Sequence, residues 1–157
     1  MFQASEHPMS LDDTLSALRG LMAGETDLVA NAANFSALVA EQLSDINWLG
    51  FYFLKGDELV LGPFQGRPAC VRIPIGRGVC GTVVETGVTQ CVPDVHAFPG
   101  HIACDIRSRS EVVVPLRDGE RIVGVLDVDS PTPERFDADD VVFLERLAAE
   151  FCQQQFG

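Results

Sequence analysis

The sequence predicts an α+β fold in which helices pack on a mainly antiparallel sheet. Two segments rich in apolar residues, 48–64 and 111–129, each contain a polar turn and are typical of β-hairpins. Apolar residues recur at helical spacing near both ends of the chain. Since a hairpin pairs its strands antiparallel, the sheet built from two of them is antiparallel as well. The length of 157 residues is that of a single domain, covering residues 1–157.

The sequence predicts four helices, and three of them have recognisable signals at their ends. Ser10 has an N-cap side chain and acidic residues follow it, while Gly24 ends the first apolar stripe. Asp137 or Asp139 lies near the start of the last helix, and Gly87 closes a short one in the middle of the chain. Residues 1–9 are expected to form a poorly ordered N-terminal tail. The predicted helices cover residues 11–23, 27–43, 79–86 and 137–155.

Strand signals lie between these helices. The first hairpin pairs 48–54 with 59–64, and the second pairs 111–116 with 121–129 through a turn at Arg117–Glu120. Residues 70–75 contain Pro74, which restricts them to an edge strand or an extended segment. A further short strand is expected at 90–93.

The charge of the chain limits its partners. The formal net charge is −12 at pH 7, so nucleic acids and anionic membranes are not expected to bind. No apolar run approaches the roughly 20 residues that a membrane span needs. The N-terminus has no basic region followed by an apolar one, so a cytoplasmic protein is expected. An acidic protein also suits a site for a cation, such as the amino group of a small molecule.

Three carboxylates are expected to gather at one end of the sheet. Side chains alternate across a strand, so Asp127 and Asp129 continue the face that begins with Val123 and Val125. The hairpin places Glu111 opposite that end. Such a cluster would attract an ammonium group and raise the pKa of at least one carboxyl. The alternative is a strand that simply emerges into solvent at this point.

Two aromatic residues in the first hairpin share one face of the strand. Trp48 and Tyr52 are large and amphipathic, as residues in pocket walls often are. Packing in an ordinary core is the alternative for both. Leu49, Phe51 and Phe53 share the opposite face and are expected in the core.

The five cysteines are an odd number with no C-x-x-C spacing, which favours reduced or catalytic thiols over a structural framework. Cys70, Cys80 and Cys104 lie in loop or glycine-rich contexts and could form a redox set. Basic neighbours of Cys104 and the helix start at Cys80 would favour thiolates. Burial as small apolar residues is the alternative, and it is the expectation for Cys91 and Cys152.

Two further motifs are weak. A zinc site could use His96, His101 and Cys104 with Cys70 or Cys80, but the spacing matches no usual zinc pattern. The glycines of 76–81 spell G-x-G-x-x-G without the preceding buried strand and later acid of a dinucleotide site. No metal site is therefore predicted.

Taken together, these segments resemble the free methionine-(R)-sulfoxide reductases, single-domain proteins of the GAF fold. The resemblance covers most of the chain, and it includes a cysteine triplet that GAF domains in general do not share. The stretch 94–105, Asp-Val-His-Ala-Phe-Pro-Gly-His-Ile-Ala-Cys-Asp, belongs to it. The residues that carry it are 47–52, 62–70, 76–81, 94–105, 108–111 and 126–130.

The resemblance implies an oxidoreductase that works through thiols. Cys104 would attack the sulfoxide sulfur, release methionine and become a sulfenic acid. Cys70 would resolve this acid as a disulfide, and Cys80 would have an auxiliary role. Thioredoxin would recycle the thiols in a pathway of oxidative-stress repair, and no cofactor is implied.

The resemblance also assigns the substrate pocket. Glu111, Asp127 and Asp129 would hold the substrate ammonium and help to protonate the leaving oxygen. Trp48 would form a wall beside the S-methyl group, and Tyr52 and Asp105 fall on matching positions. A homodimer is expected, because GAF domains often pair through helices. The alternative function is a GAF-type sensor that binds a small molecule without turnover.

Overall fold

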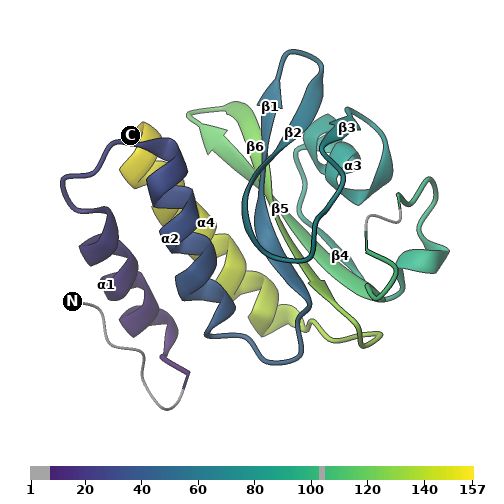
Figure 1. Ribbon diagram of the computed structural model, residues 1–157, viewed down its shortest axis with the longest axis horizontal. Coiled ribbons are helices and arrows are strands. Elements are labelled where there is room, and N and C mark those ends of the chain that lie inside the picture. The colour runs from purple at the N-terminus through teal and green to yellow at the C-terminus, as the bar shows by residue number, and fades with distance from the viewer. Residues whose placement is uncertain (1–7, 103–104) are drawn as a thin grey trace.

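The computed structural model describes residues 8–102 and 105–157 of the chain. Helices lie at both ends of the sequence, and strands occupy most of the middle (Figure 1). The elements are α1 (Leu11–Met22), α2 (Leu28–Ala40), β1 (Trp48–Lys55), β2 (Glu58–Gly66), β3 (Arg72–Pro74), α3 (Gly78–Thr86), β4 (Gln90–Val92), the short 3₁₀ helix η1 (Val95–Ala97), β5 (Ser110–Asp118), β6 (Arg121–Ser130) and α4 (Ala138–Phe156).

Within the described residues the strands form one six-stranded sheet in the order β3-β2-β1-β6-β5-β4. All of its pairings are antiparallel. Figure 1 shows three layers: α1, α2 and α4 on one side, the sheet in the middle, and α3 with the connecting loops on the other. The predicted α+β fold and its two long hairpins are thereby confirmed.

The two faces of the sheet pack against different partners, because successive side chains on a strand point in opposite directions. Leu49 and Phe51 of β1 join Leu126 and Val128 of β6 under the three long helices. Phe35 of α2 also belongs to this large core, and its ring meets that of Phe51 edge-on at 5.1 Å. Trp48, Tyr52, Val113 and Val125 point the other way and pack with α3. Trp48 and Tyr52, which were predicted as site residues, therefore lie on the face of the sheet that packs against α3, opposite the three long helices.

The sequence signals for the helix ends agree with the structure. The side chain of Ser10 accepts a hydrogen bond from the amide of Asp13, and Asp27 caps α2 in the same way. At α4, Asp137 and Asp140 form a reciprocal capping box. None of the helices in the described part of the chain is long and apolar enough to cross a membrane.

One prediction about burial was wrong. Cys91 was expected to be buried, and its side chain is exposed. It lies on β4, the last strand of the sheet, which pairs only with β5. An edge strand has a neighbouring strand on one side only, which leaves its side chains more accessible than those of the central strands.

Gly50 in β1 allows β2 to pack closely against β1, and it pairs with Asp127 on its other side. A Cβ at Gly50 would lie 2.2 Å from Cβ of Phe64 and 2.9 Å from the carbonyl oxygen of Pro63. We expect Gly50→Ala to lower the free energy of unfolding by about 3 kcal/mol, because neither backbone nor Cβ can move aside. The shift of the denaturant midpoint measures the effect.

The matched control is Gly20→Ala in α1, where an added Cβ meets nothing within 4 Å. Alanine is the better helix former, so this change should stabilise the protein by about 0.5–1 kcal/mol. Equal effects of the two substitutions would contradict the close approach of β2 to β1.

Candidate active site

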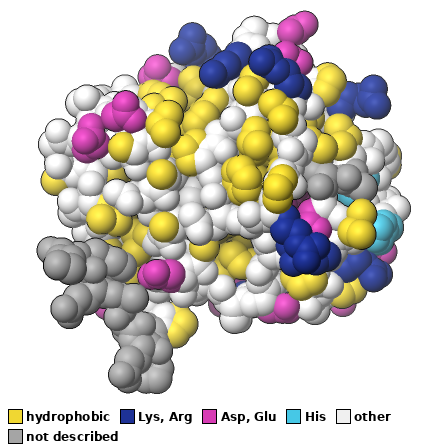
Figure 2. Space-filling view, in the orientation of Figure 1, with side chains coloured by type: hydrophobic (Ala, Val, Ile, Leu, Met, Phe, Trp, Pro, Cys, Tyr) yellow, Lys and Arg dark blue, Asp and Glu magenta, His cyan; other side chains and the backbone are white. Residues whose placement is uncertain are grey.

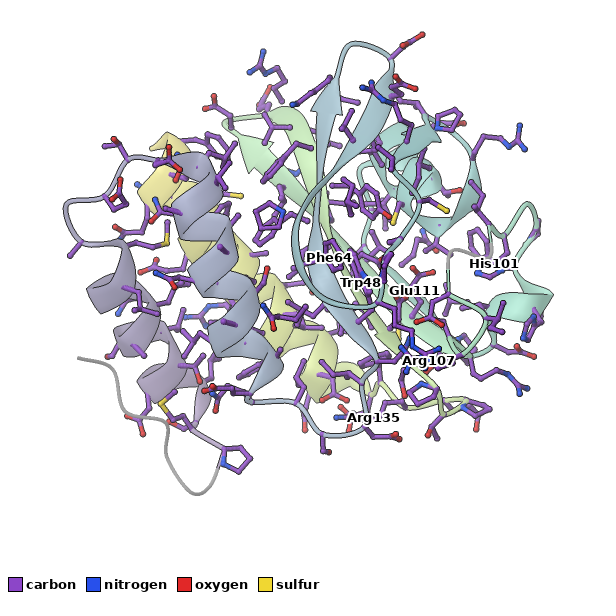
Figure 3. The ribbon with its side chains drawn as sticks, in the orientation of Figure 1. Trp48, Phe64, His101, Arg107, Glu111 and Arg135 are labelled. Carbon is purple, nitrogen blue, oxygen red and sulfur yellow. The ribbon has the colours of Figure 1, made fainter. Side chains whose placement is uncertain are left out.

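A pocket opens on the α3 side of the sheet, over the ends of β1, β6 and β5. Figure 3 shows Glu111 beside Trp48 there, with Arg107 and His101 toward the loops. On the face drawn in Figure 2, magenta acidic atoms are visible in a recess bordered by basic and hydrophobic side chains. The lining residues are Trp48, Tyr52, Ala69, Ile73, Arg77, Gly78, Val79, Cys80, His101, Ile102, Asp105, Ser108, Glu111, Asp127 and Asp129.

The floor of the pocket is built by strand register. Glu111 pairs directly with Asp129 across β5 and β6, and Asp127 lies two residues before Asp129 on β6. On the other side of β6, Asp129 pairs with Trp48. The three carboxylates are only 6–8% exposed. The sequence prediction that they gather at one end of the sheet is confirmed, and the alternative of a strand emerging into solvent is wrong.

These carboxyl groups cannot all be charged at once. Burial, followed by repulsion from Asp129 and Glu111, raises the pKa of Asp127 well above its usual range. Burial and the charge of Glu111 do the same to the pKa of Asp129. Oδ1 of Asp127 is buried and has no hydrogen-bond partner. Without a ligand, burial and mutual repulsion therefore favour the protonated carboxyls, and the cluster has an acceptor atom without a partner.

The raised pKa of Asp127 predicts how the stability of the protein depends on pH. Between the unfolded pKa of about 3.8 and the raised folded pKa, native Asp127 keeps a proton that the unfolded chain has lost. Stability must then fall as the pH rises through this interval. We expect ligand-free Asp127→Asn to melt at a higher temperature than the wild type at mildly alkaline pH. The difference should shrink in mild acid, because the amide introduced by the substitution cannot ionise.

Thermal melts across this pH range provide the measurement, with Asp118→Asn as the control at an exposed position of the same hairpin. Asp118→Asn should leave the pH dependence of the wild type unchanged. A wild type that gains stability relative to Asp127→Asn on going from acid to alkali would mean that the buried carboxylates are stabilised as anions.

An aromatic wall stands beside the carboxylates. The Trp48 ring stacks between Phe64, at 5.1 Å, and Tyr52, at 5.8 Å between centroids. The indole nitrogen of Trp48 donates to the carbonyl of Arg67 at 3.2 Å, which ties the wall to the loop after β2. Trp48 and Tyr52 are both buried and both line the pocket, so the two sequence readings, pocket wall and core, apply together.

Tyr52 links the pocket to one of the candidate redox cysteines. Its hydroxyl donates to the carbonyl oxygen of Cys70 at 2.9 Å. Burial, followed by the charge of Asp127, raises the pKa of Tyr52, so the hydroxyl remains a donor. Cys70 is disulfide-bonded, whereas Cys80, Cys91 and Cys152 are free. Ala69, the residue before Cys70, lines the pocket.

Cys80 lies in the pocket, but its chemistry differs from the sequence prediction. The start of α3 was expected to favour a thiolate, and this is wrong. Cys80 is 5% exposed, and burial together with the charges of Asp127 and Glu111 raises the pKa of its thiol well above the usual value. Burial and the nearby carboxylates raise the pKa of the thiol by more than the start of the helix can lower it. Cys80 is a neutral thiol here.

Asp105 lines the pocket as an ionised anchor. Its carboxylate accepts two hydrogen bonds from the Arg107 side chain and one from the Arg107 amide, at 2.9–3.2 Å. Nδ2 of Asn47 donates to Asp105 at 3.0 Å and lies 3.1 Å from Oγ of Ser108. The hydrogen bonds from Arg107 lower the pKa of Asp105 to about 2. This network fastens the segment after residue 104 to the start of β1.

The sequence reasoning gave Asn47 no role, because an isolated asparagine before a strand carries no periodic or motif signal. Of its neighbours in the network, Arg107 was noted only as a basic residue near a cysteine, whereas Asp105 was placed in the pocket by the family resemblance. The predicted nucleophile, Cys104, lies outside the described residues. Of the other predicted site residues, all except Cys70 line the pocket itself.

The histidine-based zinc site, which was weighed from the sequence as an alternative, finds no support among the described residues. The rings of His96 and His101 are 6.2 Å apart, edge to face. Within residues 8–102 and 105–157, the side chains close enough to share a metal are Cys80, Glu111 and Asp127. Neither histidine belongs to that group.

Comparison with known proteins finds close relatives over nearly the whole chain. A family model described as the GAF domain matches residues 13–154. The free methionine-R-sulfoxide reductase of Escherichia coli (strain K12) is 58% identical over 130 residues, which cover 83% of this chain and 79% of that protein.

Two solved structures are similar over almost their full length. The structure of fRMsr of Staphylococcus aureus in its reduced form has a TM-score of 0.89 and 47% identity, covering 97% of this chain and 99% of that one. The free methionine-R-sulfoxide reductase from Neisseria meningitidis, in complex with its substrate, has a TM-score of 0.90 and 44% identity, covering 98% and 95%.

Proposed function

Because this chain belongs to the GAF-domain family of free methionine-R-sulfoxide reductases, we propose that it reduces free L-methionine-(R)-sulfoxide to methionine with thiols as the reductant. It is an oxidoreductase that acts on a sulfur group and takes its electrons from cysteines. The observation that carries the proposal is the buried cluster of Glu111, Asp127 and Asp129 beside Trp48.

The cluster suits a free amino acid. An α-ammonium group can replace the protons that the ligand-free carboxylates retain, and it can meet the unpartnered Oδ1 of Asp127. A methionine within a peptide has no such ammonium. Binding it would leave the carboxyls either neutral, with no ion pair to the ligand, or buried as anions without a counter-charge, which is costly. Glu111, Asp127 and Asp129 thus bind the substrate, and Trp48 is the wall against which its S-methyl group packs.

The same cluster can supply a proton. In the reducing step the thiolate of Cys104 bonds to the sulfoxide sulfur, and a raised-pKa carboxyl protonates the sulfoxide oxygen. The oxygen passes to Cys104 as a sulfenic acid, and methionine leaves with its sulfur reduced. One ammonium offsets only one of the three negative charges, so Asp127 or Asp129 can keep its proton and act as the donor, because burial raises the pKa of both. Asp105, ionised and bonded to Arg107, instead positions the adjoining loop.

The second half of the cycle uses Cys70. Its thiol attacks the sulfenic sulfur of Cys104, forms a disulfide and releases the oxygen as water. The disulfide-bonded state of Cys70 supports this role, as does the hydrogen bond from Tyr52 that fixes its backbone. Cys80, buried and neutral, is an auxiliary thiol. Both electrons come from cysteines, so the reaction needs no metal or organic cofactor.

The setting of the enzyme follows from this chemistry. A dithiol protein, thioredoxin, regenerates the cysteines by disulfide exchange in the cytoplasm and so supports repair after oxidative stress. A homodimer would pair through α2 and α4. Phe35 and Phe151 are buried in the core, so outward residues such as Val29 and Val142, at 64% and 53% exposed, would form the contact.

A turnover assay tests the proposal. The protein is supplied with free R or S methionine sulfoxide, thioredoxin, its reductase and NADPH, and the loss of NADPH is followed. We expect consumption with the R isomer alone. Binding of the R isomer without turnover would favour a GAF-type sensor, and no response to either isomer would refute the assigned substrate.

A further inference from the structure

The pocket contains a set of metal-binding atoms that the reduction does not require. Sγ of Cys80 and one carboxylate oxygen each from Glu111 and Asp127 lie within 4.8 Å of one another. They come from α3, β5 and β6, and all three residues are at least nine-tenths buried. Oδ1 of Asp127 has no hydrogen-bond partner. A buried acceptor of this kind, beside a free thiol, indicates room for a cationic ligand.

The donor types select the class of cation. A thiolate with two carboxylates suits zinc and its thiophilic relatives, while magnesium and calcium prefer oxygen alone. In tetrahedral zinc sites, bonds of about 2.0–2.3 Å place neighbouring donors roughly 3.3–3.6 Å apart. Separations of up to 4.8 Å would have to contract by as much as about an ångström, which side-chain rotation can supply. Three protein donors leave a fourth position toward the pocket.

We propose that Cys80, Glu111 and Asp127 bind a thiophilic divalent cation of the zinc class, and that the bound cation blocks the pocket. The metal would displace protons from the thiol and the carboxyl group and neutralise the buried charge that forms. It would then occupy the carboxylates that otherwise receive the substrate ammonium. The binding stands by itself, whereas the inhibition rests on the proposed function. The cation is an inhibitor and takes no part in the reduction.

Cadmium titration tests the binding, because a cadmium–thiolate bond absorbs in the ultraviolet. Metal-free full-length protein carrying Cys70→Ser and Cys104→Ser excludes those two thiols as donors. We expect one cadmium per chain, with the absorbance of a single thiolate, and displacement by zinc. Adding Cys80→Ser should abolish the band. Adding Cys91→Ser instead should leave it intact, since Cys91 lies on an exposed edge strand.

Substituting a carboxylate ligand gives a second test of the site, in which no thiol is changed and cadmium affinity is measured. Asp127→Asn should weaken cadmium binding by on the order of 10- to 100-fold. Glu120→Gln, at an exposed turn of the same hairpin, should have no effect. Circular dichroism and thermal melts confirm that each variant is folded. A band that persists without Cys80, or an affinity unchanged by Asp127→Asn, would overturn the proposed site.

Turnover in the presence of zinc tests the inhibition separately. Release of methionine by the reduced wild type in a single turnover, without thioredoxin, should be suppressed by zinc and restored by excess substrate or a chelator. Inhibition that substrate does not relieve would overturn the shared use of the carboxylates. Cadmium binding by a protein that shows no turnover in metal-free buffer would contradict the proposed function and leave the metal site standing.

Discussion

A Cys104→Ser variant is expected to release no methionine from methionine-(R)-sulfoxide, even in one turnover with fully reduced protein. Serine cannot form the bond to the sulfoxide sulfur or take up its oxygen as a sulfenic acid. Cys70→Ser is expected to behave differently. It should release one methionine per chain and then stop, with a sulfenic acid that a sulfenic-acid-selective reagent can trap. Quenched single-turnover reactions with quantification of methionine provide the measurement.

The matched control is Cys91→Ser, which removes a thiol from an exposed edge strand and should keep full turnover. Cys70→Ser and Cys104→Ser together also test which of the two cysteines attacks the substrate and which one resolves the sulfenic acid. An inactive Cys70→Ser beside an active Cys104→Ser would mean that their roles are reversed. The structural argument for Cys70 as the second thiol is its fixed backbone, held by the Tyr52 hydroxyl at the pocket wall.

Asp127→Asn and Asp129→Asn are each expected to lower kcat/KM by on the order of 10²- to 10⁴-fold. Each change removes a carboxyl that can hold the ammonium or donate the proton, and the remaining acids are left in a pocket from which water is largely excluded. Steady-state kinetics with the R isomer measure the loss. Glu120→Gln on the exposed turn of the same hairpin should retain wild-type kinetics.

The two carboxylate predictions about Asp127 fit together. The substitution should stabilise the ligand-free protein at alkaline pH and also impair the enzyme, because a buried ionisable group opposes folding where no ligand meets it. An Asp127→Asn variant with both wild-type kinetics and wild-type melting would contradict the assigned role. Loss of activity with loss of folding would show as a lowered melting temperature, the opposite of the expected shift.

The acidic floor of the pocket could be predicted because two simple periodicities determine it. Alternation along β6 puts Asp127 and Asp129 on one face, and the short hairpin turn sets the register that brings Glu111 opposite Asp129. The three long helices could also be predicted, because each has a capping residue followed by a regular apolar stripe.

Other features depend on contacts between distant parts of the chain. The thiolate expected at Cys80 follows from its place in α3, but the acids that oppose it arrive from β5 and β6. The anchoring of Asp105 needs Asn47, 58 positions earlier in the sequence. Charge and burial at a site are properties of the folded packing, so local patterns predicted the residues better than their protonation.

The central claim is that the buried carboxylates select a free amino acid. The most direct test is the ratio of kcat/KM for free methionine-(R)-sulfoxide to that for its N-acetylated form, measured on the wild type with the same reductant. Loss of the ammonium leaves buried charge without a partner, so we expect the free form to be preferred by on the order of 100-fold or more. Equal kcat/KM values for the two compounds would contradict the account.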